Sequence, residues 1–293
     1  MKIVVGIPAY NEQKNIAAIL IKLKKISKDI IVCDDGSKDL TAEIAEDLGA
    51  IVIHHERNLG YGAGIKSIFL KAKEIKADVL ITFDADGQHR IEDINTVLEP
   101  IKNNDADIVI GSRFLEKESE IPKYRKFGIK TITNLTNSSI GEKLSDSQSG
   151  FRAYNKEVLE KINPSESGMG ISTEILIKAA KKKFRIKEAP IIVSYKGETS
   201  SHHPVSHGVS VVFSTIKYTS IEHPLKFYGI PGAIFFGIGM FFIFWTLQMF
   251  SEVGKIITNI SLIGIGAIVL GVMLLVTGTI LYSIISVVRE QKS

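Results

Sequence analysis

The sequence predicts an α/β fold in which a mostly parallel sheet is flanked by helices, followed by an amphipathic interface helix and a C-terminal two-helix transmembrane hairpin. Three observations predict this fold. Short apolar runs alternate with longer amphipathic ones over the first 111 residues, which is typical of a parallel sheet covered by helices. Polar strings follow several of the apolar runs. Two long uncharged stretches, Phe227–Ser251 and Ile256–Val288, lie towards the C-terminus.

The strands and helices predicted in the first part of the chain alternate regularly. The apolar runs predicted as strands are Ile3–Ile7, Ile30–Cys33, Ile51–His54, Val79–Phe83 and Ile108–Ile110. The amphipathic stretches predicted as helices are Asn15–Ile26, Thr41–Leu48, Gly64–Ile75 and Ile91–Ile101. Ligands of such sheets bind beyond the carboxyl ends of the strands. The polar strings at those ends are Pro8–Glu12, Asp34–Ser37 and Asp84–His89.

The alternation loosens between Gly111 and Ile192. This part of the chain contains a basic segment, Lys123–Lys130, and a polar turn, Asp146–Arg152. A helix-like stretch, Thr173–Lys183, then precedes another predicted strand, Phe184–Val193. We interpret residues 1–200 as one domain.

The C-terminal part has the composition of a membrane anchor. Residues 201–226 combine a polar loop with apolar residues at helical spacing, which predicts a helix in the membrane interface. Each uncharged stretch exceeds the roughly 20 residues that cross a bilayer, so residues 227–289 are predicted to form two transmembrane helices. Basic residues flank one side of this hairpin, and the positive-inside rule therefore places the preceding domain in the cytoplasm. The alternative is a buried helical hairpin in a soluble protein.

Charge balance and cysteine content exclude several classes of protein. The chain has 36 Lys and Arg against 32 Asp and Glu, a formal charge of +4, which suits a membrane surface better than nucleic acid. The single cysteine, Cys33, cannot form an intrachain disulfide, and the sequence has no Cys/His spacing typical of zinc. We therefore expect a reducing compartment and no nucleic-acid partner.

Asp84 and Asp86 are the candidate metal ligands. They flank Ala85 at the end of a predicted strand, so one turn can aim both carboxylates at one point. Hard oxygen ligands of this kind suit a Mg²⁺ or Mn²⁺ ion that also holds substrate phosphates, and Gln88 offers a third oxygen. The alternative for such a pair is a solvated or helix-capping role. His89 either reaches a pyrophosphate or fills the turn.

Two other loops at the same edge carry candidate nucleoside contacts. One of Asp34 and Asp35 is expected to cap a helix, and the other to accept a hydrogen bond from a nucleobase or ribose. The string Pro8–Glu12 has a similar double interpretation. Its residues either cap a helix and pack a turn or form a wall of a nucleoside pocket, with Glu12 reaching a sugar hydroxyl.

The glycines of Gly60–Gly64 follow a strand and open a helix. A dinucleotide site needs G-x-G-x-x-G in the first strand–turn–helix unit, whereas this sequence has G-x-G-x-G in the third. We therefore expect these glycines to let the helix approach a bound nucleotide beside Arg57 and Asn58.

Taken together, these strings resemble the dolichyl-phosphate glycosyltransferases of the inverting family-two glycosyltransferase class. The resemblance extends from the first strand to about Pro231 and implies a GT-A-like fold. The motifs that carry it are P-A-Y-N-E at 8–12, D-D-G-S at 34–37, R-N-x-G at 57–60, D-A-D-G-Q-H at 84–89, G-S-R at 111–113 and D-x-x-x-G-F-R at 146–152.

The resemblance implies a nucleotide-diphosphate-sugar donor and a dolichyl or other polyprenyl phosphate acceptor in the membrane lipid. It implies that Asp84, Asp86 and Gln88 bind the metal ion and that Arg113 contacts a phosphate group. The residues it implies around the donor are Pro8, Tyr10, Glu12, Cys33 through its backbone, Asp35, Asp84 and Ala85.

One departure from the family concerns the sugar. Mannose-transferring relatives have a later R-x-x-G-x-S-K string, in which the positions of the Arg and the final Lys are Ser194 and Ser200 here. Lys196 is a substitute cation for substrate binding, as are nearby histidines. The string T-S-x-x-x-P-V-S-H-G at 199–208 is more similar to archaeal glucosyl and N-acetylglucosaminyl members. Glucose, N-acetylglucosamine and mannose all remain candidates.

The chemistry of the transfer needs positioning and charge more than a base. A phosphate monoester has a second pKa of about 6, so the acceptor phosphate is already an anion at neutral pH. Arg113, Arg125 and Arg152 suit its phosphate, because guanidinium binds it bidentately, although Arg125 also fits a solvated or headgroup-facing surface. Asp146 either orients Arg152 or acts as a base. Glu174 either stabilises a helix N-terminus or takes part in catalysis.

Three alternatives stay open at this point. A processive polysaccharide synthase is disfavoured because its Q-x-x-R-W string is absent and the one tryptophan, Trp245, lies in a predicted span. Extension of a lipid-linked oligosaccharide is compatible with the motifs. A catalytically inactive membrane adaptor is disfavoured by the intact carboxylates and arginines. The predicted spans also offer small-residue faces for a homo-oligomer.

Overall fold

The computed structural model describes residues 1–115, 121–194, 220, 224–254 and 258–290. The chain forms two compact units, Met1–Thr215 and Ile216–Ser293. The first unit is an α/β domain, and the second contains two long apolar helices. The predicted interface helix around positions 205–216 lies outside the described residues.

The first unit contains a seven-stranded sheet with the order β3-β2-β1-β4-β6-β5-β7. Most neighbouring strands are parallel, but β6 runs antiparallel to both β4 and β5. The mostly parallel sheet predicted from the apolar runs is thus confirmed. Its strands are β1 (Ile3–Ala9), β2 (Asp29–Asp34), β3 (Ile51–His54), β4 (Val79–Thr82), β5 (Ile108–Ser112), β6 (Arg152–Asn155) and β7 (Ile186–Pro190).

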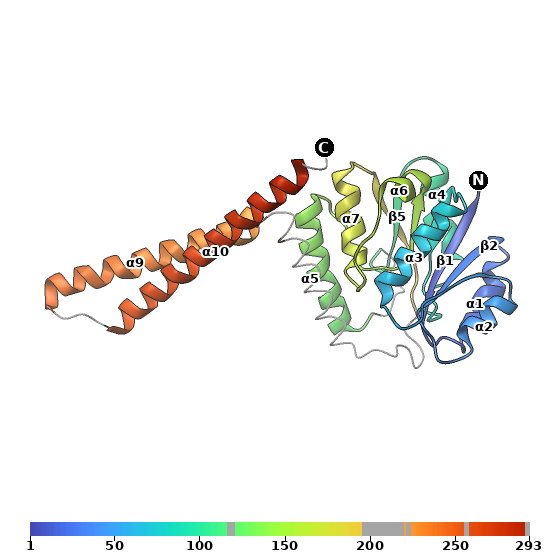
Figure 1. Ribbon diagram of the computed structural model, residues 1–293, viewed down its shortest axis with the longest axis horizontal. Helices are drawn as coiled ribbons and strands as arrows, with labels where there is room; N and C mark the ends of the chain where they lie inside the picture. Colours follow the sequence, from blue (N-terminus) through green and yellow to red (C-terminus); the bar gives the residue numbers. More distant parts are fainter. Residues whose placement is uncertain (116–120, 195–219, 221–223, 255–257, 291–293) are drawn as a thin grey trace. The chain divides into compact units, whose positions relative to one another are not determined.

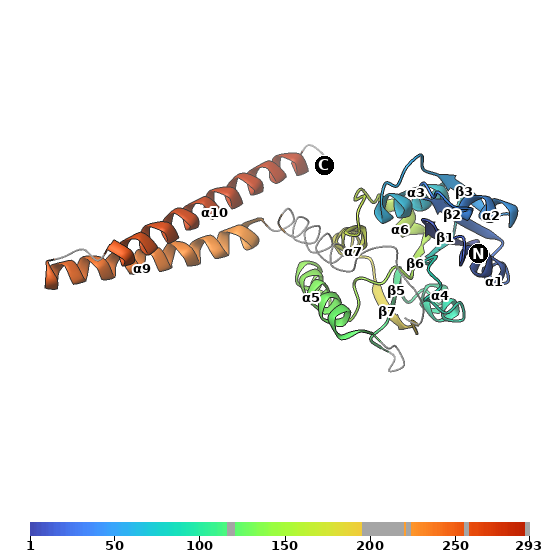
Figure 2. The same ribbon diagram turned by 90° about the horizontal axis from the view of Figure 1, so that it is seen from below.

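Helices cover both faces of this sheet, as Figures 1 and 2 show. Buried side chains of α1, α2 and α4 form one core with the strands, and those of α3, α6 and α7 form another on the opposite face. Helix α5 packs against α7. The helices are α1 (Ile16–Leu23), α2 (Thr41–Asp47), α3 (Tyr61–Glu74), α4 (Asp93–Lys102), α5 (Lys123–Ile140), α6 (Lys156–Lys161) and α7 (Ile171–Lys181).

Strand β6 is an element that the sequence pattern did not predict, as are the helices α5 and α6 on either side of it. Its first residue, Arg152, was expected in a polar turn, yet it pairs with Thr82 of β4 and Ile110 of β5. An arginine at the start of a central strand is tolerated here because each of its three side-chain nitrogens donates a hydrogen bond inside the protein, as described below. The strand places the loop before it, Ser145–Phe151, at the carboxyl ends of β4 and β5.

The second unit is a helical hairpin with α9 (Ile230–Val253) and α10 (Thr258–Glu290) side by side, preceded by a short π-helix, η1 (Leu225–Gly229). The unit contains two candidate membrane spans, Leu225–Glu252, which runs from η1 into α9, and Thr258–Val287 in α10, with mean hydropathies of 2.0 and 2.6. Only 17% and 11% of the residues in their most apolar windows are buried. Exposed apolar side chains in such numbers favour a lipid environment over water.

Glycines let α9 and α10 approach closely. They recur at a spacing of seven residues, at positions 232 and 239 on α9 and at 264 and 271 on α10. A Cβ added to Gly239 would lie 2.7 Å from the carbonyl oxygen of Gly264, and one added to Gly271 would lie 2.6 Å from the backbone nitrogen of Phe236. Small residues are what bring helix backbones together in membranes.

Candidate active site

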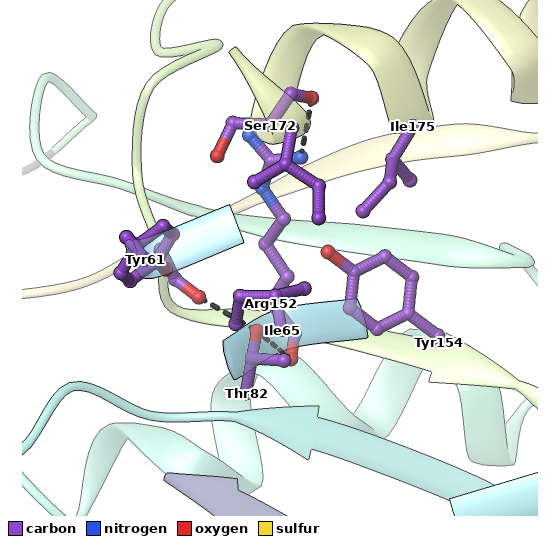
Figure 3. A pocket seen from close by; sticks show the side chains of 9 residues that line it. Tyr61, Ile65, Thr82, Arg152, Tyr154, Ser172 and Ile175 are labelled. Atoms are coloured by element: carbon purple, nitrogen blue, oxygen red, sulfur yellow. Dashed lines mark hydrogen bonds between the residues drawn. The ribbon is translucent and has the colours of Figure 1, made fainter. Parts of the chain in front are cut away.

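The carboxylate of Asp84 lies just beyond β4 and is held from two sides. The hydroxyl of Tyr61 donates to Oδ1 at 3.3 Å, and Nε2 of His89 lies 3.1 Å from Oδ2. Gly150 leaves room for this carboxylate, because an added Cβ would come within 2.8 Å of both of its oxygens. Tyr61 and Gly150 also line a small cavity of about 10 Å³, into which Arg152 extends from β6 (Figure 3).

Asp86 lies close enough to Asp84 for each charge to affect the other. Burial opposes ionisation of Asp84, but the hydrogen bond and charge of His89, together with the charge of Arg113, hold its pKa below the ordinary value. Burial and the Asp84 charge raise the pKa of Asp86, although the charge of Arg125 acts in the other direction. Two carboxylates of this kind repel unless a cation lies between them.

The residues around the two aspartates are buried. Ala85 and Gln88 are 4% and 8% exposed. The backbone N–H of Gln88 donates to Oδ1 of Asp86 at 3.0 Å, which fixes the turn that carries both carboxylates. Among the residues that the structure describes, no group of three or more His, Cys, Asp and Glu could hold a metal alone. Two carboxylates and an amide oxygen instead match the way Mg²⁺ binds through few carboxylates plus substrate phosphates.

Arg113 and Asp146 form a bidentate pair at the end of β5. Nε of Arg113 donates to Oδ2 of Asp146 at 2.6 Å, and Nη2 donates to Oδ1 at 2.8 Å. The Asp146 side chain is completely buried, whereas that of Arg113 is 15% exposed. Burial opposes ionisation, yet the charge and hydrogen bonds of Arg113 hold the pKa of Asp146 below its ordinary value. Of the two roles expected for Asp146, orienting Arg152 is wrong, because its carboxylate holds Arg113 instead.

Arg152 holds the loop that precedes it through hydrogen bonds to backbone carbonyl oxygens. Its guanidinium donates to the carbonyl oxygens of Ser147 (2.6 Å), Ser149 (2.8 Å) and Ser172 (2.9 Å). The residue is 1% exposed. An acceptor phosphate would have to displace these backbone contacts to reach it. The arrangement thus favours a positioning role over the phosphate contact predicted from the sequence.

The segment after β7 contacts both the end of β5, next to Arg113, and the turn that carries Asp86. Ile191 donates its N–H to the carbonyl of Ser112 at 3.1 Å, next to Arg113. Val193 forms an antiparallel bridge with His89, and the N–H of Ser194 donates to the carbonyl of Gln88 at 3.0 Å. One short stretch of backbone therefore contacts the neighbours of Arg113 and the turn that carries Asp86.

Asp35 at the end of β2 organises the loop that leads into α3. Its carboxylate accepts from the N–H groups of Leu59 (2.9 Å) and Gly60 (2.8 Å) and lies 2.7 Å from Nδ1 of His55. Cys33 is buried beneath this cluster, with Sγ 3.6 Å from Nε2 of His55. Burial and the nearby Asp35 charge raise the pKa of Cys33 to about 12, so its thiol stays protonated.

The loop after β1 is tied to the loop after β2. Asn11, at a positive φ of 56°, receives a hydrogen bond from Lys38 and donates its own N–H to Ser37. Glu12 accepts from the Asn15 side chain, and burial raises its pKa. Pro8 and Tyr10 are half-buried on either side of the end of β1. The sequence-predicted nucleoside residues therefore gather at one edge of the sheet.

The glycines at the start of α3 meet protein backbone. An added Cβ at Gly62 would lie 2.4 Å from the carbonyl oxygen of Gly168, and one at Gly60 would lie 2.8 Å from that of Ser167. The prediction that these two glycines admit a nucleotide is thus wrong. Their missing side chains instead leave room for the loop that contains Ser167 and Gly168. Glu174 holds this loop, because it is 1% exposed and accepts from the N–H groups of Ser165 and Glu166.

The structure describes one of the two remaining basic residues predicted for the site, Arg125, but not the other, Lys196. Arg125 lies on α5, where its charge acts on Asp86. Lys196 lies outside the described residues. The sequence patterns missed Tyr61, Gly150, His55 and Glu188. Of these, Tyr61 and Gly150 stand in strings that the sequence singled out, Gly60–Gly64 and D-x-x-x-G-F-R at 146–152, but were given no role of their own. Glu188 is an acidic residue within the predicted strand Phe184–Val193.

The chain is similar to known glycosyltransferases over the part that forms the α/β domain. A family model described as glycosyl transferase family 2 matches residues 4–163. The UDP-N-acetylglucosamine–dolichyl-phosphate N-acetylglucosaminyltransferase of Methanococcus voltae is 36% identical over 64% of this chain and 84% of that protein. The dolichyl-phosphate hexose transferase of Haloferax volcanii is 30% identical over 71% of this chain and 90% of its own length.

A solved structure supports the fold. Glucosyl-3-phosphoglycerate synthase from Mycobacterium tuberculosis, crystallised with Mn²⁺, uridine diphosphate and phosphoglyceric acid, superposes with a TM-score of 0.60 at 17% identity. The match covers 74% of this chain and 78% of the synthase chain. At this identity the likeness concerns the arrangement of sheet and helices.

Proposed function

Because the chain belongs to glycosyl transferase family 2, we propose that it transfers one sugar from a nucleotide-diphosphate donor to dolichyl or another polyprenyl phosphate. The names of the Methanococcus voltae and Haloferax volcanii relatives support this acceptor. The first of these names, together with the serines at positions 194 and 200, favours a UDP-sugar over GDP-mannose. The reaction inverts the anomeric centre and takes place at the cytoplasmic face of the membrane.

The observation that carries the proposal is that Asp84 and Asp86 follow β4 and Arg113 follows β5, so the two carboxylates and this arginine lie at the same end of the sheet. The charge of Arg113 acts on Asp84, and that of Arg125 acts on Asp86. A site of this composition can hold two anionic substrates together, with cations for the acceptor phosphate beside carboxylates for a divalent ion.

The donor set of Asp84, Asp86 and Gln88 fits Mg²⁺ or Mn²⁺. When bound, the ion neutralises the charge that develops on the departing nucleoside diphosphate. The chain itself positions this site: Tyr61 and His89 orient Asp84, and the N–H of Gln88 orients Asp86. In the proposal the nucleoside lies against the loops of Pro8, Tyr10, Glu12, Cys33 and Asp35.

The reaction needs no base from the protein. The acceptor phosphate is an anion above its second pKa of about 6, so its oxygen can attack the anomeric carbon directly. The bond to the nucleoside diphosphate breaks on the opposite side, which inverts the centre. Asp146 is an unsuitable base because it is buried and both of its oxygens are bonded to Arg113. Arg113 and Arg125 instead bind and orient the acceptor phosphate.

The proposed domain division is 1–200 for catalysis, 201–226 for an interface segment and 227–289 for two spans. The hairpin then serves to keep the enzyme at headgroup height, where the lipid phosphate emerges. Deleting residues from Phe227 onward is expected to leave donor binding intact and to weaken the use of long-chain acceptors. Unchanged kinetics with long-chain acceptors would contradict this role.

The function is tested with membranes that contain the full chain. Labelled UDP-glucose, UDP-N-acetylglucosamine and GDP-mannose are offered in turn with dolichyl phosphate, and label extracted into organic solvent is counted. We expect label from a UDP-sugar, with one sugar on each lipid. A product with several sugars would favour extension of a lipid-linked oligosaccharide. Absence of lipid label with all three donors, in membranes where the chain is folded, would contradict the proposal.

A further inference from the structure

Glu188 on β7 is an acidic side chain whose contacts converge on one turn. Its Oε1 accepts from the N–H of Ser145 at 2.9 Å, from the hydroxyl of Ser145 at 3.0 Å and from the N–H of Asp146 at 2.8 Å. Its Oε2 accepts from the N–H of Ser145 at 2.8 Å. A carboxylate that receives several hydrogen bonds holds its donors firmly, because bonds to a charged acceptor are about twice as strong as neutral ones.

The turn held by Glu188 carries the partner of Arg113. Asp146 projects from it into the interior and binds the guanidinium with both oxygens. Ser145 makes a second link, since its hydroxyl lies 2.6 Å from that of Ser112, the residue before Arg113. Glu188 is also the register partner of Ile110, three residues before Arg113. These contacts lead to Arg113 itself through Asp146, and to its neighbours on β5 through Ser112 and Ile110.

Arg113 needs such support because a guanidinium on a long side chain has many rotamers. Its orientation depends on the position of Asp146, which binds it with both oxygens, and the backbone N–H of Asp146 is held by Glu188. A displacement of about 1 Å in a substrate-positioning group can lower the rate about 100-fold. The contacts of Glu188 therefore bear on catalysis although its carboxylate need not touch a substrate.

We propose that Glu188 is a positioning residue for Arg113, acting through Asp146, and that it thereby sets the affinity for the acceptor phosphate. The acceptor part of this inference rests on the proposed function. A merely structural role for Glu188 would lower the stability of the domain without preference for one substrate. A positioning role predicts a selective effect on the acceptor and on the reactivity of Arg113.

The test compares Glu188→Gln with Glu160→Gln in the full chain. Gln keeps the shape of Glu188 but presents an NH₂ group to backbone N–H donors. Glu160 is a matched control, because it is an exposed residue of α6 that lies 3.9 Å from Lys156. We expect E188Q to raise the KM for dolichyl phosphate about tenfold or more, while the KM for the nucleotide sugar stays as in the wild type. E160Q is expected to change neither.

A second measurement does not depend on activity. The rate at which phenylglyoxal modifies Arg113 is followed by mass spectrometry of the peptide that contains it. We expect a rate about threefold or more above wild type in E188Q, because the Asp146 pair is loosened, and no change in E160Q. If E188Q does not fold, Glu188→Asp, which retains the charge, is expected to give smaller changes in the same directions.

The outcomes separate this inference from the proposed function. Unchanged Arg113 reactivity in a folded E188Q or E188D chain would overturn the positioning role. So would equal increases in the KM of both substrates. If the wild type places no sugar on dolichyl phosphate while E188Q still makes Arg113 more reactive, the positioning role stands and the proposed acceptor is wrong.

Discussion

Asp146 holds Arg113 with both carboxylate oxygens, at 2.6 Å from Nε and 2.8 Å from Nη2. The pair lies at the end of β5, where the acidic member is buried and the basic member reaches the surface. Because the pKa of Asp146 is held below its ordinary value, this carboxylate is ionised at neutral pH. In the proposed function it acts on the reaction through the orientation of Arg113.

The first prediction concerns the pH dependence of transfer. Since Asp146 stays ionised well into the acid range, the acid limb of kcat/KM at saturating metal is expected to follow the acceptor, whose second pKa is about 6. Activity then falls as pH decreases through that value. A phosphorothioate acceptor, which is more acidic, should move the limb to lower pH. A limb that stays in place would assign it to a group on the enzyme.

The second prediction is that Asp86→Asn abolishes transfer while membrane insertion is retained. Removing a charged ligand is expected to lower kcat/KM by more than the about 10- to 100-fold typical of outer-shell changes at metal sites. Sugar transfer and carbonate extraction of membranes are the two measurements. Asp105→Asn, at an exposed residue that lies 3.8 Å from Lys187, is the control. Undiminished transfer by D86N would refute the metal assignment.

The third prediction concerns Gly150, which faces Asp84. In Gly150→Ala the new methyl would lie 2.5 Å from the Tyr61 hydroxyl and 2.8 Å from the Asp84 oxygens. Asp84 must then move, and nucleotide affinity measured by calorimetry in the presence of Mn²⁺ is expected to fall about tenfold or more. Gly128→Ala on α5 meets no atom within 4 Å and should bind nucleotide as the wild type does. Equal affinities in the two variants would contradict this geometry.

The fourth prediction uses the glycines of the hairpin. Alanine at Gly239 or Gly271 would place a methyl within 2.7 Å of backbone atoms of the opposite helix. These variants are expected to lose about 1–3 kcal/mol of stability, seen as a lower unfolding temperature in detergent. Alanine at Gly237 or Gly266, where no atom lies within 4 Å, supplies the comparison and should be neutral. The packing of α9 on α10 would be wrong if all four behaved alike.

The fifth prediction concerns acid stability. Burial opposes ionisation of Glu174, but hydrogen bonds from Lys178 and Ser165 lower its pKa below 4.5. A lowered pKa in the folded state stabilises the protein above the unfolded-state pKa, and this contribution is lost as pH falls through the folded-state value. Glu174→Gln should therefore cost about 2 kcal/mol at neutral pH and flatten the fall in unfolding temperature below about pH 4.5.

The matched comparison for Glu174 is Glu157→Gln. Glu157 is 64% exposed and pairs with Lys161 on the surface of α6, so its replacement should be nearly neutral. An E174Q chain with the acid profile of the wild type would show that Glu174 is not the group responsible.

Much of the fold follows from local patterns, because short continuous apolar runs and amphipathic runs of period 3.6 identify parallel strands and their covering helices. The position of Asp84 and Asp86 after β4 was predictable for the same reason. Strand β6 was not, because it begins with Arg152, whose burial depends on the carbonyls of Ser147, Ser149 and Ser172.

The supporting residues of the site were harder to predict. Glu188 contacts Ser145 across 43 positions of sequence, and Tyr61 reaches Asp84 across 23. Gly150 matters only because of what its missing side chain leaves open. Such roles depend on tertiary contacts, which no local periodicity records, whereas the carboxylates themselves lie directly at a strand end.

The backbone between Glu188 and Ser194 connects the strand end next to Arg113 with the turn that carries Asp86. Because main-chain hydrogen bonds link it to Ser112 on one side and to Gln88 on the other, the spacing between the strand end that carries Arg113 and the turn that carries Asp86 is set by backbone and not by side chains. Substitutions in the surrounding side chains can therefore reshape this region while the backbone keeps Arg113 and Asp86 at the same separation.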